Sequence, residues 1–295
     1  MNTVRLIINP ISGRGRGARV VEQVSRLLHD CGLPHELCLS HSPTDPTELA
    51  REAVRNRAQL VIGLGGDGLI NQIANELISS ETVLGIIPAG VGNDFARGLG
   101  IPLGIEDACA VLAQGKTHRV DVGQVNERYF LSVAVMGLAA QVNRRANQFQ
   151  RLRVSALYSA LTVASVLLDT PQSFTLQYDG QTRRCYSWLI AVANTWSCAR
   201  GMALVPAARA DDGVLDACIV NGMGKVELLY TFPRVFRGRH IYHTGIETIC
   251  GREITVSTDN QCDLYADGER IGALPATFKA VPQALCVIIP HLDRR

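Results

Sequence analysis

The sequence lacks the patterns typical of proteins that are held together by disulfides, bind several metal ions or bind nucleic acid. Its nine cysteines are an odd number and are scattered, and no two have C-x-x-C spacing, so neither a disulfide framework nor a zinc site is indicated. The seven histidines show no metal-ligand spacing. A net charge of +2 gives no general reason to expect a nucleic acid partner. We therefore predict reduced, mostly buried thiols in a cytoplasmic protein.

Long hydrophobic runs are also missing. No stretch approaches the ~20 apolar residues that a transmembrane helix needs. The apolar run near the N-terminus, residues 4–8, is too short for a signal-peptide core, and no small-residue cleavage pattern follows it. An apolar content of 47% over 295 residues is nevertheless ample for two ordinary domains. The sequence predicts a protein that is cytoplasmic and meets a membrane only peripherally.

Two glycine-rich loops dominate the first half of the chain. Residues 63–68 and 88–94 each follow a short apolar run that reads as a buried parallel strand, and each precedes a helical pattern. Glycines remove side chains where the backbone turns, and the next helix points free N–H groups at the gap, which suits phosphate. Asp67 and Asp94 lie inside these loops. Because a carboxylate repels a bare phosphate unless a cation or a transferable proton lies between them, the loops predict metal–nucleotide chemistry.

Strands and helices alternate through the first part of the chain, which predicts a doubly wound, Rossmann-like parallel sheet. Ligands of such sheets bind beyond the carboxyl ends of the strands, so we expect Ser12, Asp67 and Asp94 around one crevice. The expected strands are 4–8, 36–39, 60–62 and 83–87, and the expected helices are 18–29, 47–56, 70–78 and 106–114.

A third glycine-rich turn, residues 9–17, ends the first expected strand and carries Arg14 and Arg16. Its glycines would let the backbone approach an anion, and its arginines could fork onto that anion. The alternative is a flexible turn with solvated arginines. The glycine spacing does not reproduce the G-x-G-x-x-G of a dinucleotide-binding loop.

After about residue 121 the pattern changes to short β-like segments separated by polar and glycine turns, which is typical of an antiparallel sheet or sandwich. We therefore predict an α/β domain over residues 1–124 and a β-rich domain over residues 125–295. Residues 275–295 are a candidate to pack back on the first domain. The expected strands are 129–135, 174–178, 185–193, 214–220, 254–257, 262–266 and 285–289.

One long helical pattern, residues 141–168, interrupts the second half. It begins with the basic residues Arg144, Arg145, Arg151 and Arg153 and continues as an apolar run. It is either a core helix with a solvated entry or a lipid-cleft wall whose arginines meet anionic headgroups. A second basic cluster of Arg234, Arg237, Arg239 and His240 could face the same membrane or be an ordinary loop.

Five motifs in order make the chain resemble the diacylglycerol kinase catalytic-domain family, specifically the small bacterial soluble lipid kinases of the NAD-kinase-like superfamily. The resemblance runs nearly end to end. The motifs are residues 9–13 (NPISG), 65–68 (GGDG, with Asn71 and Asn75 after it), 88–97 (PAGVGNDFAR), 211–216 (DDGVLD) and 267–269 (DGE).

The resemblance implies transfer of the γ-phosphate of ATP to a lipid hydroxyl, with Mg²⁺, in a cleft between the two domains. The proton acceptor falls on Glu269 with Asp267 beside it, and Asp67 is the third catalytic candidate. A structural metal site falls on Asp212, with backbone carbonyls near Arg209 and Val214. The residues expected to bind the nucleotide are Asn9, Ser12, Gly13, Ser40, Gly65, Gly66, Asp67, Gly68, Leu69, Ile70, Asn71, Gly90, Val91, Asn93, Asp94 and Arg97.

The expected chemistry also follows from the residue types. A lipid hydroxyl is a poor nucleophile near neutral pH, so a carboxylate must accept its proton as attack begins, and Glu269 is the candidate. The transferring phosphoryl group spreads negative charge, which Arg97 and Mg²⁺ held by Asp67, with or without Asp94, would offset. The expected partners are a lipid substrate and an anionic membrane surface, and a homodimer stays open.

Two positions depart from the family pattern. Leu69 and Val91 stand where threonines are usual, and each change deletes a hydroxyl that could bond phosphate or ribose. Each loss would cost about 1 kcal/mol or more. A catalytically silent nucleotide- or lipid-binding protein is therefore an alternative, as is an NAD kinase, whose family shares the glycine–glycine–aspartate loop and the two-domain plan.

Overall fold

The computed structural model describes residues 4–10, 12–42, 44–148 and 155–291, and it divides into two compact units. The first unit comprises residues up to Val122 together with the stretch from Pro282 onward, and the second runs from Gly123 to Val281. Two strands, β5 (Lys116–Val125) and β17 (Ala276–Ile289), each run from one unit into the other. Among the described residues no helix is long and apolar enough to cross a bilayer.

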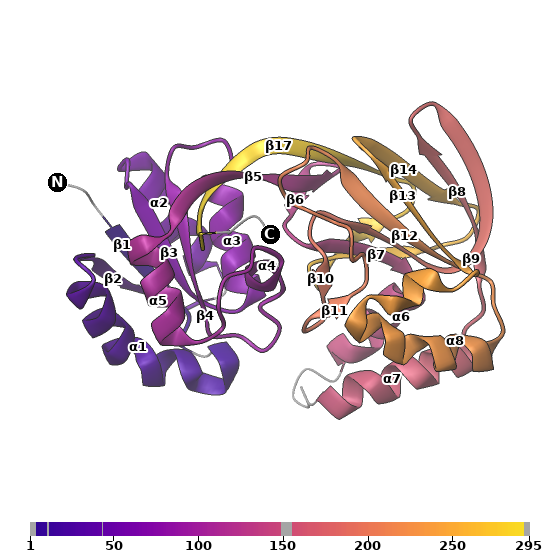
Figure 1. Cartoon of the computed structure of the whole chain (residues 1–295), viewed down its shortest axis with the longest axis horizontal. Helices are drawn as coiled ribbons and strands as arrows, with labels where there is room; N and C mark the ends of the chain where they lie inside the picture. The colour runs from indigo at the N-terminus through magenta and orange to yellow at the C-terminus, as the bar shows by residue number, and fades with distance from the viewer. Residues whose placement is uncertain (1–3, 11, 43, 149–154, 292–295) are drawn as a thin grey trace. The chain divides into compact units, whose positions relative to one another are not determined.

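The first unit is built on a parallel sheet with the strand order β2-β1-β3-β4-β17. All five residues of β1 are buried, as are the six of β3, which matches strands that are covered on both faces. Helix α1 packs against α5, and α2 packs against α3 (Figure 1). The elements are β1 (Val4–Ile8), α1 (Ser12–Asp30), β2 (Glu36–Leu39), α2 (Asp45–Arg55), β3 (Leu60–Gly65), α3 (Asp67–Leu77), β4 (Val83–Pro88), α4 (Asp94–Gly98) and α5 (Ile105–Gln114).

This strand order indicates where a ligand would bind to the sheet. The chain reverses direction across the sheet between β1 and β3, and a crevice at such a reversal is where ligands of doubly wound sheets bind. Strand β3 ends at Gly65, and β4, its neighbour, ends at Pro88. Both glycine-rich loops therefore begin at the carboxyl edge of the sheet, as the alternating pattern predicted.

The predicted turn over residues 9–17 is wrong in its extent. Helix α1 begins at Ser12, so the three glycines that suggested a turn lie within its first two turns. The buried side chains of Val24 and Leu28 anchor the later part of this helix in the core. Tertiary packing thus outweighs the low helix propensity of glycine. The short helix α4 was not predicted, because its five residues are too few to show a helical period.

The second unit is a β sandwich with helices against one of its faces. Antiparallel pairs run in the order β16-β15-β7-β9-β8-β14-β17, and β12 pairs with both β9 and β13. The elements are β6 (Arg128–Phe130), β7 (Val133–Gly137), α6 (Leu138–Gln148), α7 (Ser155–Leu168), β8 (Gln172–Tyr178), β9 (Gln181–Ala193), β10 (Ser197–Cys198), β11 (Met202–Ala203), β12 (Leu215–Asn221), α8 (Lys225–Thr231), η2 (Phe232–Arg237), η3 (Arg239–Tyr242), β13 (Ile246–Gly251), β14 (Glu253–Thr258), β15 (Asp263–Ala266) and β16 (Glu269–Ala273).

Two cores lie on opposite sides of these strands. One joins inward side chains of the strands and contains the edge-to-face pair Phe130 and Phe278, with ring centroids 6.4 Å apart. The other lies under the helices and includes Trp188, whose indole N–H donates to the carbonyl of Met223 at 2.9 Å. Figure 1 shows α6, α7 and α8 together beside β7 and β9.

Two element predictions in this unit are wrong. The expected strand 129–135 is interrupted after Phe130 and resumes at Val133 as β7, for a reason given with the site below. The expected helix 141–168 is two helices, α6 and α7, which pack against each other. Arg145 on α6 forms a two-pronged ion pair with Asp169 beyond the end of α7, at 2.6 and 2.8 Å. Contact with anionic headgroups was one of two interpretations of this pattern, and two of its arginines, Arg151 and Arg153, lie outside the described residues.

Candidate functional site

The two glycine-rich loops touch through their backbones. A Cβ added to Gly90 would lie 2.4 Å from the Cα of Gly66, so neither a side chain nor a ligand separates the loops at this point. The backbone N–H of Ala89 also donates to the carbonyl of Gly65 at 2.8 Å. Glycine is required here by close approach rather than by an unusual φ angle. The loops therefore form one structure, which the sequence predicted only from chain order.

Asp67 holds the second loop in place. One of its carboxylate oxygens accepts the backbone N–H of Asn93 at 2.7 Å, and the other accepts the N–H of Asp94 at 2.5 Å. These are the first N–H groups of α4, which has no cap from its own N-cap side chain. Asp67 therefore caps a helix that begins 27 residues further along the chain. The sequence predicted Asp67 as a metal ligand and missed this role.

The Asp94 carboxylate lies close to that of Asp67. A Cβ built on Gly92 would meet Oδ2 of Asp67 at 2.6 Å and Oδ2 of Asp94 at 3.0 Å, so both oxygens border the same glycine. Among the described residues no group of three or more His, Cys, Asp or Glu side chains gathers as a metal site. Mg²⁺ commonly takes only one or two carboxylates and completes its shell with phosphates and water, so this pair fits it.

Asn93 and Arg97 stiffen the second loop. The Asn93 side chain accepts the N–H of Gly90 at 2.9 Å and donates to the carbonyl of Gly90 at 3.2 Å. Its backbone is left-handed, with φ of 54°, which asparagine tolerates better than most residues. The Arg97 Nε donates to the carbonyl of Gly92 at 3.0 Å. Asn93 and Arg97 are both predicted nucleotide ligands. The Asn93 side chain shapes the loop, whereas Arg97 uses only Nε for its bond to Gly92 and not its two terminal nitrogens.

The positions that depart from the family pattern lie in different surroundings. Leu69 is 5% exposed and packs on Gly65, and Ile70 is also buried, so their side chains belong to the core. Leu69 and Ile70, which were predicted to bind nucleotide, could therefore do so only through their backbone atoms. Val91 is 49% exposed at the outer edge of the second loop. Loss of a hydroxyl therefore alters the loop surface only at Val91.

The remaining predicted nucleotide ligands of the first unit lie near the same sheet edge. Asn9 follows β1, and Ser12 and Gly13 open α1, although the side chains of those two lie outside the described part. Ser40 is buried after β2, where its hydroxyl donates to the carbonyl of Ser42 at 3.0 Å. Gly68 is exposed in the first turn of α3, and Asn71 one turn later accepts from Asn75 through both its side chain and its carbonyl.

In the second unit the Asp267 carboxylate binds a stretch of backbone. Its carboxylate accepts the N–H of Leu131 at 2.7 Å, of Ser132 at 2.9 Å and of Val133 at 3.2 Å. These bonds replace strand pairing at residues 131 and 132, which is why the predicted strand 129–135 is interrupted. Its oxygens thus hold residues 131–133 against the turn that connects β15 to β16, and the catalytic role of Asp267 beside Glu269 stays a prediction.

Glu269 begins β16, directly after this turn. Asp267 and Gly268 both have left-handed backbones, with φ of 47° and 84°, as a two-residue hairpin turn requires. The Glu269 side chain is exposed, and its backbone pairs with Ala266. An exposed carboxylate on an anchored hairpin is free to meet a substrate hydroxyl. This geometry suits a general base.

The predicted structural metal site at residues 209–214 is a tight turn. The Arg209 guanidinium pairs with the Asp211 carboxylate through two bonds of 3.0 Å. Oδ1 of Asp212 accepts the N–H of Val214 at 3.2 Å, which closes the turn. Burial, and then the charge of Asp212, raise the pKa of nearby Asp216. A cation at Asp212 stays a prediction.

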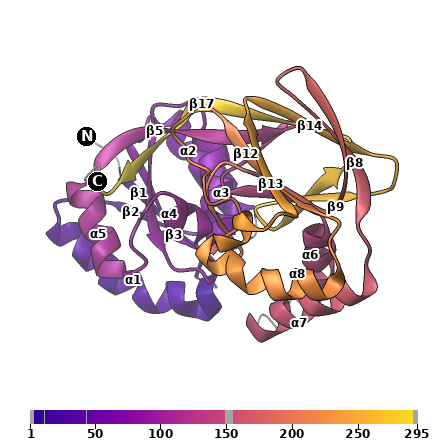
Figure 2. The same ribbon diagram turned by 45° about the vertical axis from the view of Figure 1, so that its right-hand side comes forward.

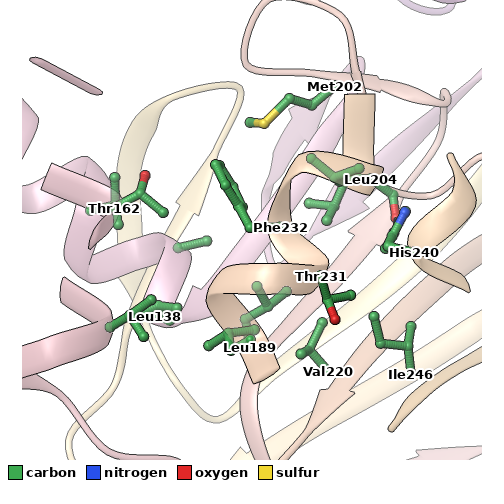
Figure 3. Close-up of a pocket in the computed structure, with 15 residues that line it drawn as sticks. Leu138, Thr162, Leu189, Met202, Leu204, Val220, Thr231, Phe232, His240 and Ile246 are labelled. Atoms are coloured by element: carbon green, nitrogen blue, oxygen red, sulfur yellow. Dashed lines mark hydrogen bonds between the residues drawn. The ribbon is translucent and has the colours of Figure 1, made fainter. Parts of the chain in front are cut away.

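The second unit also contains an apolar pocket of about 90 Å³, which the sequence did not reveal (Figure 3). Its walls come from α6, α7, α8, η2, η3 and neighbouring strands, so no local motif marks it. The only hint in the sequence was the apolar part of the 141–168 pattern. The lining residues are Leu138, Ala139, Val142, Thr162, Val166, Leu189, Met202, Leu204, Val220, Leu228, Thr231, Phe232, Val235, His240 and Ile246.

Two polar side chains line this apolar pocket with an atom that has no partner among the described residues. They are Thr231 through Oγ1 and His240 through Nδ1, and both side chains are almost fully buried. The other imidazole nitrogen, Nε2, lies 2.9 Å from the carbonyl of Leu204 and must carry the proton in order to donate to it. Burial lowers the pKa of His240, although the bond to Leu204 opposes this. His240 is therefore neutral near pH 7.

The neutral state of His240 makes stability depend on pH. The unfolded chain takes up a proton near its ordinary pKa of about 6.5, whereas the folded protein resists it, so stability should fall as pH drops below about 6.5. The slope from this one group is up to about 1.4 kcal/mol per pH unit until the lower folded pKa is reached. We expect His240→Gln, which keeps a donor for Leu204, to lose this slope in urea denaturation series.

His118→Gln is the matched control, because His118 is exposed on β5. It should leave the pH dependence of unfolding as in the wild type. An unchanged slope in His240→Gln would contradict the assignment of a buried neutral imidazole.

Comparison with known proteins identifies the family. Residues 3–125 match the diacylglycerol kinase catalytic domain family, and residues 132–289 match the YegS C-terminal NAD kinase beta sandwich-like domain. A diacylglycerol kinase of Mycobacterium tuberculosis is 31% identical over 98% of this chain and 95% of its own length. A diacylglycerol kinase of Bacillus subtilis is 29% identical over 98% of this chain and 97% of its own length.

Solved structures agree on the fold. The crystal structure of a diacylglycerol kinase from Bacillus anthracis superposes with a TM-score of 0.79 at 21% identity, covering 98% of this chain and 97% of that one. A second crystal structure from the same organism gives a TM-score of 0.84 at 22% identity, covering 98% and 96%. The expected combination of a doubly wound domain with a β sandwich is thereby confirmed. The chain belongs to the diacylglycerol kinase catalytic-domain family and is a lipid kinase.

Proposed function

We propose that this protein transfers the γ-phosphate of ATP to the hydroxyl of diacylglycerol or a related lipid, with Mg²⁺, at a membrane surface. The family makes ATP the expected donor. The observation that carries the proposal is the joined pair of glycine loops, in which the Asp67 and Asp94 carboxylates border Gly92. Carboxylates beside a phosphate repel it unless a cation lies between them, so Mg²⁺ is the proposed ion.

The residues of the first unit would bind and orient the triphosphate. The exposed N-terminus of α3, with Gly66 and Gly68, offers backbone N–H groups without side chains in the way. Arg97, held by the carbonyl of Gly92, would bring positive charge beside the loop. Asp67 and Asp94 would hold the ion, which supplies charge neutralisation on the phosphates when bound.

The residues of the second unit would serve the acceptor lipid. Glu269 would accept the hydroxyl proton as the oxygen forms its bond to the γ-phosphorus, while the bond to the β-phosphate oxygen breaks and ADP leaves. Asp267 keeps the hairpin that presents Glu269 in place. The apolar pocket offers a dry site for part of an acyl chain, since nearly all of its lining is hydrocarbon.

The test is a transfer assay with labelled ATP, Mg²⁺ and a panel of dispersed lipids, with NAD as a competing acceptor class. We expect label in a lipid extract, identified by mass, and loss of transfer when the metal is removed by a chelator. Label found only in NADP would replace the proposal with an NAD kinase. Lipid or nucleotide binding without any turnover would favour the silent protein that Leu69 and Val91 suggested.

A further inference from the structure

The segment from α8 to η3, residues 225–242, has two unlike faces. Its inward side chains, among them Leu228, Phe232 and Val235, line the apolar pocket. Its other side chains include several large aromatic groups that remain exposed. Both views of the fold show α8 beside α7 at the outer edge of the second unit (Figure 2).

The exposed side carries what we call the aromatic–basic face, which consists of Tyr230, Arg234, Phe236, Arg237, Arg239 and Tyr242. Tyr242 is 82% exposed, Tyr230 70% and Phe236 54%, which is far from the usual state of aromatic side chains. The Arg234 guanidinium lies 5.0 Å from the centre of the Tyr230 ring, so the two kinds of group are interleaved. Five of the six also line one shallow surface hollow together with Pro233.

Aliphatic side chains extend this face. Val226 on α8 is 81% exposed, and Leu168 at the end of α7 is 73% exposed. The two helices are tied together, because Nζ of Lys225 donates to the carbonyl of Leu167 at 2.6 Å. The exposed aliphatic side chains therefore come from two helices that contact each other.

The segment carries a net positive charge. Residues 225–243 contain Lys225 and three arginines but a single acid, Glu227. Oε1 of Glu227 lies 3.2 Å from Nε2 of His243. Within the described part of the chain, none of the three arginines of the face forms an ion pair with a carboxylate. Positive charge on this face is thus available to an anionic partner.

We propose that the aromatic–basic face docks on the surface of an anionic lipid bilayer. Arginines bind anionic headgroups, and tyrosine and phenylalanine bury their rings at the level between headgroups and acyl chains. The exposed Val226 and Leu168 fit hydrocarbon and have no use in binding nucleic acid. The positive charge of the face therefore favours an anionic partner. The exposed side chains of Val226 and Leu168 favour a lipid surface over other polyanions.

One consequence rests on the proposed function. The helix and 3₁₀ turns that carry this face also form a wall of the apolar pocket. An acceptor lipid in the bound bilayer would then lie on the outer side of the segment whose inner side lines the pocket. Docking at this face would therefore bring the substrate close to the pocket.

The experiment measures co-sedimentation of the full chain with vesicles of phosphatidylglycerol and phosphatidylcholine, in the absence of ATP. We expect binding to the mixed vesicles, weak binding to pure phosphatidylcholine, and loss of binding at high salt because screening acts on charge. The triple variant Arg234→Ala, Arg237→Ala, Arg239→Ala should bind about 100-fold more weakly. Tyr242→Ser and Phe236→Ser should also reduce binding at low salt, and the salt dependence of the binding that remains should stay as in the wild type.

Matched controls come from β9 of the same unit, where Arg184 and Tyr186 are both exposed. Arg184→Ala and Tyr186→Ser should bind vesicles as the wild type does. Equal binding by the wild type and the face variants would overturn the proposal. So would a dimer that Phe236→Ser dissociates in analytical ultracentrifugation, with no vesicle binding, because the face would then meet a second copy.

A second readout separates this proposal from the function itself. Each face variant is assayed on diacylglycerol dispersed in neutral detergent micelles, where docking to an anionic surface is not needed. We expect wild-type rates there and reduced rates on anionic vesicles. Vesicle binding with no phosphorylation of any lipid would refute the proposed function and leave the docking face standing.

Discussion

Replacing Asp67 by alanine should reduce phosphoryl transfer to a lipid at least about 100- to 1,000-fold, the range that loss of one electrostatic contact in a transition state produces. The carboxylate is proposed to hold Mg²⁺ with Asp94, and it caps α4 through the N–H groups of Asn93 and Asp94. Alanine leaves both donors uncapped, so stability should also fall by about 1 to 3 kcal/mol. Steady-state kinetics and urea denaturation measure the two effects.

Asp67→Asn separates these roles. An amide oxygen can still accept one of the two N–H groups but is a poor ligand for Mg²⁺, so transfer should fall while much of the stability returns. Asp30→Ala is the matched control, since Asp30 is exposed at the end of α1, and it should leave both quantities near wild type. Full activity in Asp67→Ala would show that the metal is held elsewhere.

Glu269→Gln should lower kcat about 100- to 10,000-fold, the range typical of lost general-base assistance. The amide matches the carboxylate in size but cannot accept the proton of the lipid hydroxyl. Because Glu269 is exposed and its backbone bonds stay in place, the free energy of unfolding should change by less than about 0.5 kcal/mol. Kinetics on dispersed diacylglycerol, with thermal unfolding alongside, provide the measurement.

The control for this variant is Glu127→Gln, an exposed acid at the turn between β5 and β6. It should turn over lipid at the wild-type rate. If the wild type and Glu269→Gln share the same near-zero rate while lipid still binds, the protein is catalytically silent. If both share the same high rate, the base lies at another residue.

Much of the fold could be predicted because its signals are local. The parallel strands before the glycine loops are buried apart from Val83, so their apolar runs stand out in the sequence, as at residues 60–65 and 83–88. Glycine and aspartate at the ends of adjacent strands then predict a phosphate edge without any coordinates. The predicted start of α1 was wrong because alternating glycines suggest a turn, whereas packing of Val24 and Leu28 stabilises a helix.

The roles of single side chains depended on contacts between residues far apart in the chain. Nothing local reveals that Asp267 binds the N–H groups of residues 131–133, which lie over 130 positions earlier. The interruption of the predicted strand 129–135 has the same origin. Leu69 was expected to weaken nucleotide binding because it lacks the hydroxyl of threonine. Its side chain is buried against Gly65, where a ligand does not reach. The apolar pocket was missed because helices and strands far apart in the chain build it together.

The cap that Asp67 places on α4 has a consequence for motion and folding. The first turn of α4 depends on an acceptor supplied from the neighbouring strand end, and Gly66 and Gly90 meet without intervening atoms. We therefore expect each loop to depend on the other for its native path. The phosphate edge therefore assembles, and locally melts, as one cooperative unit, and the slow amide exchange of Asn93 and Asp94 would report on both loops at once.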